Sequence, residues 1–339
     1  MMKKIRIGHI GVAHDHSQPV LECALRFSDI FEFVGLAEPN KKYYDEKVAN
    51  NAFYMSLPQM SVEELIAQKP DAMLIEGYEL ENLKIAELCI ENGIHIHLDK
   101  PAGADLAHFK RILDMAEAKN LVVHMGYMYR YNHAVQYCME KIADGTLGEV
   151  YQVDAFMDTC HDPEKRAWMH EFPGGNMFFL GCHMVDFVYM MMGRKPKAVI
   201  PFNRRTHFDG TDVVDHGCAV LDYGHAVSTV RATSTQVNGF GRRQLTVCGT
   251  KGTIEIKPLE VNYPDTPTIT SDIWISTKEM VGPNIYKNIC QKVELEPMVG
   301  RYEDMLADFA ACVRGEKKNK FDYKYEYELQ ELVLAACGE

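Results

Sequence analysis

The sequence predicts two domains, an N-terminal α/β domain with a doubly wound parallel sheet and a C-terminal α+β domain with a large open, mainly antiparallel sheet. Its 339 residues exceed what one compact core usually holds. Up to about residue 125, short β-type runs alternate with segments of helical periodicity. Beyond about residue 147, long strand-like runs follow one another through tight turns. We therefore expect domains at 1–125 and 126–339, with the final helices able to pack back on the first domain.

The strands and helices of the first domain follow from local patterns. Ser61 and Glu64 form the S-x-x-E signature of a helix start. Apolar residues at helical spacing, three or four positions apart, predict the other helices. The expected strands are KIRIGHIG, FEFVGLAE, DAMLIEG, HIHLD and LVVHMGY, and the expected helices are PVLECALRFSD, SVEELIAQ, NLKIAELCIENG and ADLAHFKRILDMAEAKN.

The second domain opens with a long strand, GEVYQVDAFM, and a loop rich in His, Pro and charge. A strongly apolar helix, NMFFLGCHMVDFVYMMMG, comes next. Two hairpins are then expected around Tyr223-Gly224 and Lys251-Gly252. The helices YEDMLADFAACVRG and YEYELQELVLAACG end the chain.

Composition narrows the class of protein. A net charge of −12 argues against nucleic acid as a partner, because phosphate binding needs clustered Lys and Arg. No apolar run is long enough to predict a membrane span, so no membrane partner is expected. The ten cysteines contain no C-x-x-C pair, which disfavours a zinc ribbon and agrees with buried thiols in a reducing cytoplasm. We expect a cytoplasmic protein.

The loop after the first strand begins like a dinucleotide-binding fingerprint. A Rossmann loop has G-x-G-x-x-G here and an acid about 20 residues later for the ribose hydroxyls. This chain keeps Gly11, replaces the second glycine by Ala13 and the third by His16, and places Glu38 at the end of the second strand. The charge of Glu38 would repel a 2′-phosphate, which favours NAD over NADP.

The stretch His14-Asp15-His16 also allows a metal site as an alternative. Such a site needs three or four ligands of suitable geometry. No other His or Cys cluster in the sequence can be assigned to it. We therefore expect a nucleotide loop and no metal.

Three further motifs carry a resemblance over essentially the whole chain. Asp99-Lys100-Pro101 follows a strand, at the edge where ligands of parallel sheets collect. RYNHAV follows the next strand, and GGNMFFLGCHMVD opens the apolar helix of the second domain. Together these motifs resemble the glucose–fructose oxidoreductase, inositol dehydrogenase and rhizopine-catabolism (Gfo/Idh/MocA) family.

The resemblance implies two catalytic residues, Lys100 and His183. Lys100 matches the lysine that contacts the nicotinamide ribose and the substrate hydroxyl, and burial beside oxidised nicotinamide would favour its basic form. His183 matches the histidine that assists proton transfer, and Asp186 lies one helical turn away, where it could orient the imidazole. Phe179 is a departure, because many family dehydrogenases carry Asp there to bind the substrate hydroxyl.

The expected function is NAD(P)-dependent hydride transfer between the nicotinamide and a secondary alcohol of a sugar, glycoside or polyol. A redox-neutral lyase or glycosidase with a transient keto intermediate, and a non-catalytic dinucleotide-binding sensor, remain alternatives. The resemblance also implies a homodimer or homotetramer formed through the C-terminal sheet. NAD is expected to contact Gly11, Val12, Ala13, His14, His16, Glu38, Gly77, Asp99, Lys100, Pro101 and Arg130. Substrate is expected to contact Tyr127, His161, Arg166, Trp168 and Asp186.

Overall fold

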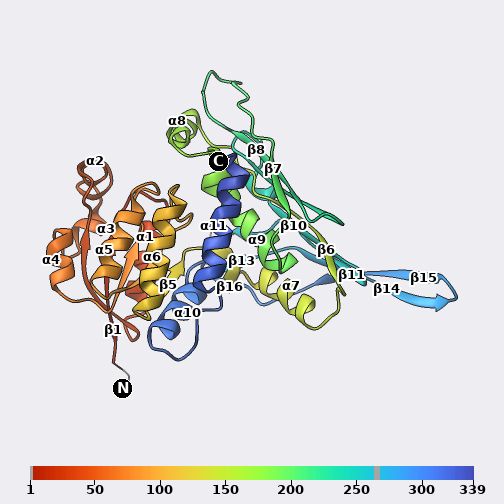
Figure 1. The fold of residues 1–339 in the computed structure, drawn as a ribbon, viewed down its shortest axis with the longest axis horizontal. Helices are drawn as coiled ribbons and strands as arrows, with labels where there is room; N and C mark the ends of the chain where they lie inside the picture. Colours follow the sequence, from red (N-terminus) through yellow and green to blue (C-terminus); the bar gives the residue numbers. More distant parts are fainter. Residues whose placement is uncertain (1–2, 263–267) are drawn as a thin grey trace. The chain divides into compact units, whose positions relative to one another are not determined.

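The computed structural model describes residues 3–262 and 268–339 and confirms the predicted fold class (Figure 1). The chain divides into two compact units. Met1–Tyr127 and Tyr302–Gln330 make up the first unit, and Met128–Arg301 and Glu331–Glu339 make up the second.

The first unit is built on a five-stranded parallel sheet with strand order β2-β1-β3-β4-β5. This order places the carboxyl ends of β1, β3 and β4 side by side, where the doubly wound fold binds its ligands. The strands are β1 (Ile5–Ile10), β2 (Phe31–Ala37), β3 (Ala72–Ile75), β4 (His95–Leu98) and β5 (Val123–Met125).

Every helix expected in this unit is present. At α4 the Ser61 hydroxyl accepts from the Glu64 amide at 3.2 Å and the Glu64 carboxylate accepts from the Ser61 amide at 2.8 Å, which confirms the capping box. The short helices between β2 and α4 were not predicted, because they are too short to show periodicity. The helices are α1 (Ser17–Arg26), α2 (Lys41–Tyr43), η1 (Tyr44–Val48), α3 (Ala52–Met55), α4 (Val62–Ala67), α5 (Asn82–Glu91) and α6 (Leu106–Ala118).

The first unit also contains a C-terminal part of the chain, α10 (Glu303–Val313) and α11 (Tyr323–Cys337) as far as Gln330. Gln330 binds the backbone on both sides of one turn after β4. Its side-chain oxygen accepts from the Ala102 amide at 3.1 Å, and its amide group donates to the Gly103 carbonyl at 2.6 Å. These bonds hold the segment that follows Lys100.

The second unit is built on an eight-stranded sheet of order β15-β14-β11-β10-β6-β9-β8-β7. Its strand pairs are antiparallel except β6 with β9. The strands are β6 (Val150–Phe156), β7 (Ala198–Pro201), β8 (His216–Asp222), β9 (Val227–Thr233), β10 (Gln244–Gly249), β11 (Gly252–Ile256), β14 (Ile273–Gly282) and β15 (Ile285–Val293). A small second sheet contains β12 (Val261–Asn262), β13 (Thr268–Thr270) and β16 (Met298–Val299).

The predicted apolar helix of the second unit is split into two elements. A π-helical turn, η4 (Met177–Gly181), leads into α9 (Cys182–Met192), which contacts β6 and β9. Every residue of α9 is buried, so its Met-rich sequence is core packing. Three short helices, η2 (Met128–Tyr131), α8 (Pro163–Trp168) and η3 (Met169–Glu171), and the longer α7 (His133–Ala143) complete the part of the unit that positions candidate residues. Among the described residues, no helix is both long and apolar enough to cross a bilayer.

Candidate functional site

The loop between β1 and α1 closes tightly on the end of β3. Gly11 has φ +89°, and a Cβ there would lie 2.3 Å from the Gly77 Cα, so position 11 needs glycine. The Val12 amide donates to Glu38 Oε2 at 2.6 Å, and the Asn40 amide donates to Glu38 Oε1 at 2.7 Å. The acid at the end of β2 therefore lies directly on the glycine turn. Burial raises the pKa of Glu38, and these two amides oppose the shift.

Two cavities flank this turn within the first unit. One has a volume of about 40 Å³ and is lined by residues that include Gly11, Glu38 and Gly77. The other is a hollow of about 570 Å³ whose lining includes Val12, His14 and Lys47. The Lys47 ammonium donates to the Ala13 carbonyl at 2.5 Å and brings positive charge to the loop. A glycine turn, an acid at the end of β2 and a nearby cation are the features that a dinucleotide-binding Rossmann loop has.

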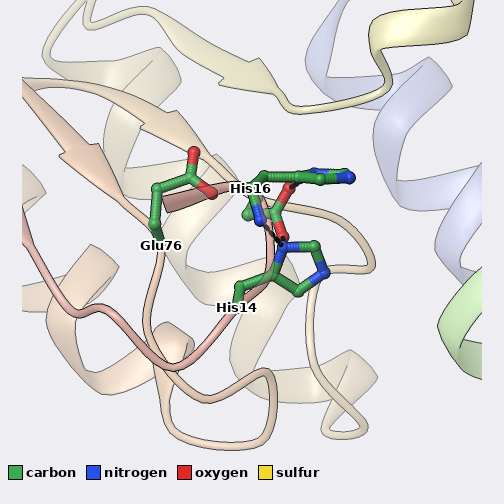
Figure 2. A group of neighbouring side chains, drawn as sticks. His14, His16 and Glu76 are labelled. Carbon is green, nitrogen blue, oxygen red and sulfur yellow. Dashed lines mark hydrogen bonds and ion pairs between the residues drawn. The ribbon is translucent and has the colours of Figure 1, made fainter. Parts of the chain in front are cut away.

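The side chains of His14 and His16 do not point outward to solvent but meet Asp99, the residue after β4. His14 Nδ1 lies 2.7 Å from Asp99 Oδ2, and His16 Nδ1 lies 3.1 Å from Asp99 Oδ1. The Glu76 carboxylate comes from the end of β3, and one ligand atom of each of these four residues lies within 4.8 Å of the others. Figure 2 shows that the Glu76 side chain rises from a different stretch of backbone than the two histidines.

Lys100 lies beside this group of side chains and has no exposed surface. Its Nζ is 3.2 Å from His14 Nε2, which also lies 3.5 Å from Glu79 Oε1. Burial lowers the pKa of His14 to about 3, so this imidazole is neutral at neutral pH. Burial raises the pKa of Glu76 well above its usual value, and the Asp99 carboxylate adds to the shift.

Glu76 and Glu79 were not predicted from the sequence as site residues. Both are fully buried, and both follow the apolar run of β3. One feature of the sequence could have indicated them: the two acids come directly after a buried parallel strand. That strand ends at the edge of the sheet where the loops after β1 and β4 also begin.

In the second unit, His183 lies near the start of α9 and is 1% exposed. The Tyr129 ring meets its imidazole edge to face, with centroids 5.0 Å apart. Asp186 forms a two-bond ion pair with Arg130, with Nε to Oδ2 at 2.8 Å and Nη2 to Oδ1 at 2.9 Å. Both oxygens of Asp186 thus contact the guanidinium of a residue expected to bind cofactor.

A second polar network surrounds Tyr129 and was missed from the sequence. The Tyr129 hydroxyl donates to Glu260 at 2.8 Å and accepts from Arg243 at 2.9 Å. Arg301 donates to both oxygens of Glu260, at 3.0 and 2.8 Å. Burial and the charge of Glu260 raise the pKa of Tyr129 to about 12. Tyr129 and Glu260 are 131 residues apart, and no local pattern connects them.

The remaining substrate candidates are distributed between the units. Tyr127 is buried in the first unit, at the end of β5. In the second unit Arg166 donates to the His161 carbonyl at 2.8 Å and forms an ion pair with Asp209. Trp168 packs edge to face on Phe179, with ring centroids 5.3 Å apart. His161, Arg166 and Trp168 thus belong to one local structure around α8, and Phe179 is part of its aromatic packing.

Comparison with known proteins identifies two family domains in the chain. Residues 5–127 match the model of the GFO_IDH_MocA oxidoreductase family, NAD-binding Rossmann fold. Residues 135–255 match the model of the GFO/IDH/MocA C-terminal domain. Among curated relatives, a trans-1,2-dihydrobenzene-1,2-diol dehydrogenase of Xenopus laevis is 25% identical over 216 residues, 62% of this chain and 64% of that protein. The match therefore spans less than two thirds of the relative's length.

Solved structures share the fold at low sequence identity. The WlbA dehydrogenase from Bordetella pertussis, in complex with NADH and UDP-GlcNAcA, has a TM-score of 0.75 and 18% identity, covering 98% of this chain and 95% of that one. The aldose–aldose oxidoreductase from Caulobacter crescentus, complexed with glycerol, has a TM-score of 0.76 and 15% identity, covering 98% and 96%. With a Rossmann domain that carries Gly11 and Glu38 and a C-terminal domain that carries His183, the chain belongs to the Gfo/Idh/MocA family of NAD(P)-binding oxidoreductases.

Proposed function

We propose that this protein is an NAD-dependent dehydrogenase that oxidises a secondary alcohol of a sugar, glycoside or polyol. The observation that carries the proposal is Lys100, an amine with no exposed surface at the carboxyl end of β4. Ligands of doubly wound folds bind at this edge. Relatives named for a diol dehydrogenase and an aldose–aldose oxidoreductase support an alcohol as the reacting group.

NAD would be held by the glycine turn and by Glu38, while Asp99, Lys100 and Pro101 would lie toward its reactive end. The bound nicotinamide supplies the hydride acceptor. Lys100 Nζ accepts the proton of the substrate hydroxyl and returns it in the reverse direction, a role worth about 10²- to 10⁴-fold in rate. His183 assists the proton transfer. Glu38 gives the preference for NAD, since its carboxylate would repel a 2′-phosphate.

Substrate would contact Tyr127 and the structure around α8 that contains His161, Arg166 and Trp168. Phe179 supplies no hydrogen bond to a hydroxyl. Its ring packs against Trp168 and stacks on Phe172, with the two phenyl centroids 6.0 Å apart. This observation favours one second candidate, a redox-neutral lyase or glycosidase in which NAD is reduced and reoxidised within one turnover.

Both candidates are tested with a panel of sugars, glycosides and inositols in the presence of NAD or NADP. Net oxidation accumulates the reduced cofactor, measured at its absorbance, whereas the redox-neutral reaction gives product without it. Lys100→Ala should lose about 10²- to 10⁴-fold in kcat. This variant should still bind tritiated NAD in equilibrium dialysis. Such binding would show that the variant is folded and that only the catalytic step is lost. Unchanged turnover in Lys100→Ala, or bound NAD in neither protein, would refute the proposal.

A further inference from the structure

The carboxyl edge of the first unit's sheet buries three acidic side chains close to one another. Glu76, Glu79 and Asp99 are each at most 1% exposed, and the Lys100 side chain is buried as well. A carboxylate removed from water without a compensating charge costs several kcal/mol. A cation bound among these side chains would offset that cost.

Four side chains at this edge lie close to the separations of metal ligands. One ligand atom of each of His14, His16, Glu76 and Asp99 lies within 4.8 Å of all the others. Bonds of about 2.0–2.2 Å from nitrogen and oxygen place any two ligands of one ion at most about 4.4 Å apart. Small movements of these side chains would therefore bring all four within reach of one ion.

Among the four proposed ligands, Glu76 is buried without a hydrogen bond that the described residues would supply. Its side chain is fully buried, and within the described residues neither carboxylate oxygen has a hydrogen-bond partner. His97 Nε2 lies 3.7 Å from Glu76 Oε1, too far for a hydrogen bond. Buried polar groups in proteins are almost always satisfied, so a carboxylate in this state indicates a ligand that completes it.

The contacts of His14 also favour a bound cation. Its Nδ1 accepts from the His16 amide at 3.1 Å, so it presents a lone pair, yet the same atom lies 2.7 Å from Asp99 Oδ2. A lone pair and a carboxylate oxygen repel each other. Moving the proton to Nδ1 satisfies Asp99 but deprives the His16 amide of its acceptor. A cation shared by Nδ1 and the carboxylate removes the conflict.

We propose that His14, His16, Glu76 and Asp99 bind one divalent first-row transition-metal ion, such as Mn²⁺, Co²⁺ or Zn²⁺. Two imidazole nitrogens and two carboxylate oxygens suit this class better than Mg²⁺ or Ca²⁺, which prefer oxygen alone. The ligands come from the loop after β1 and from the ends of β3 and β4, three adjacent strands of a rigid sheet. The site goes beyond the proposed dehydrogenase activity and does not depend on it.

The test uses the full chain and measures metal without turnover. Protein is stripped with a chelator, dialysed, loaded with CoCl₂, and assayed by elemental analysis and by the visible absorption of bound Co²⁺. The wild type should hold one ion per chain. His16→Ala, and Glu76→Gln with nearly unchanged shape, should each lose affinity by more than about 100-fold, beyond what second-shell changes cost.

His108→Ala is the matched control, because His108 also pairs with a carboxylate, Glu87, at 2.9 Å, but on the surface helix α6. It should bind Co²⁺ as the wild type does. The proposal is overturned if the wild type takes up no ion, or if His16→Ala and Glu76→Gln both bind Co²⁺ with wild-type affinity and spectrum. Either result leaves the dehydrogenase proposal intact, since NAD binding and turnover are measured separately.

Discussion

The ion pair between Arg130 and Asp186 is the buried interaction of the second unit whose loss should cost most. The two side chains are 2% and 1% exposed, and two hydrogen bonds of 2.8 and 2.9 Å join them. At 2.8 Å and an effective dielectric constant of about 20, their attraction is about 6 kcal/mol, most of which desolvation cancels. Asp186→Ala removes the attraction but leaves the desolvated guanidinium. We expect the free energy of unfolding to fall by about 3–5 kcal/mol.

The chain's own tryptophans make this measurable. It has two, Trp168 and Trp274, and both lie in the second unit. Urea unfolding followed by tryptophan fluorescence therefore reports on the unit that contains the ion pair. Asp212→Ala is the matched control, since Asp212 pairs with Arg205 at 2.8 Å on the surface of the same unit and its loss should not shift the midpoint. A loss below about 1 kcal/mol in Asp186→Ala would refute the reasoning, because removing one partner of a buried ion pair is expected to cost several times more.

Two further predictions concern the first unit. Gly11→Ala combines a positive φ with a methyl group placed against backbone, and should destabilise the protein by about 2–5 kcal/mol and abolish NAD binding, as measured by circular dichroism and equilibrium dialysis. For Asp308, burial raises the pKa, but hydrogen bonds from His124 and Lys317 outweigh it and hold the pKa well below its usual range. Its contribution to stability is therefore full above about pH 4 and is lost as the pH falls. Asp308→Asn should cost about 1 kcal/mol at pH 7, with the gap to wild type closing below pH 4; a gap independent of pH would contradict this.

Local patterns were sufficient for the strands and for α1, α4, α5 and α6 of the first unit, because the pattern of each lies within a few residues. The five apolar runs became β1 to β5, and Ser61 with Glu64 formed the predicted capping box. The second unit's apolar helix was predicted as one piece, but the chain forms η4 before α9. Periodicity over so short a stretch does not separate π-helical from α-helical turns.

Local patterns could not predict which side chains are buried together near Lys100. The sequence pointed to His14, His16 and Asp99, but each with a separate expected role at the cofactor. Glu76 joins them because β3 lies between β1 and β4, an order that no local pattern specifies. The network of Tyr129 with Glu260 depends in the same way on contacts between segments far apart in the chain.

The proposed metal ion would account for the histidines that replace glycine in the loop after β1. In a glycine-rich loop, backbone amides at the start of the helix face the phosphates. Here the Val12 amide donates to Glu38, and the His14 amide donates to the Glu76 carbonyl at 3.2 Å. With these donors engaged, the loop offers imidazole nitrogens in their place, and imidazole nitrogens attract a cation. An ion held by them would return positive charge to the loop, which is what a dinucleotide's diphosphate requires.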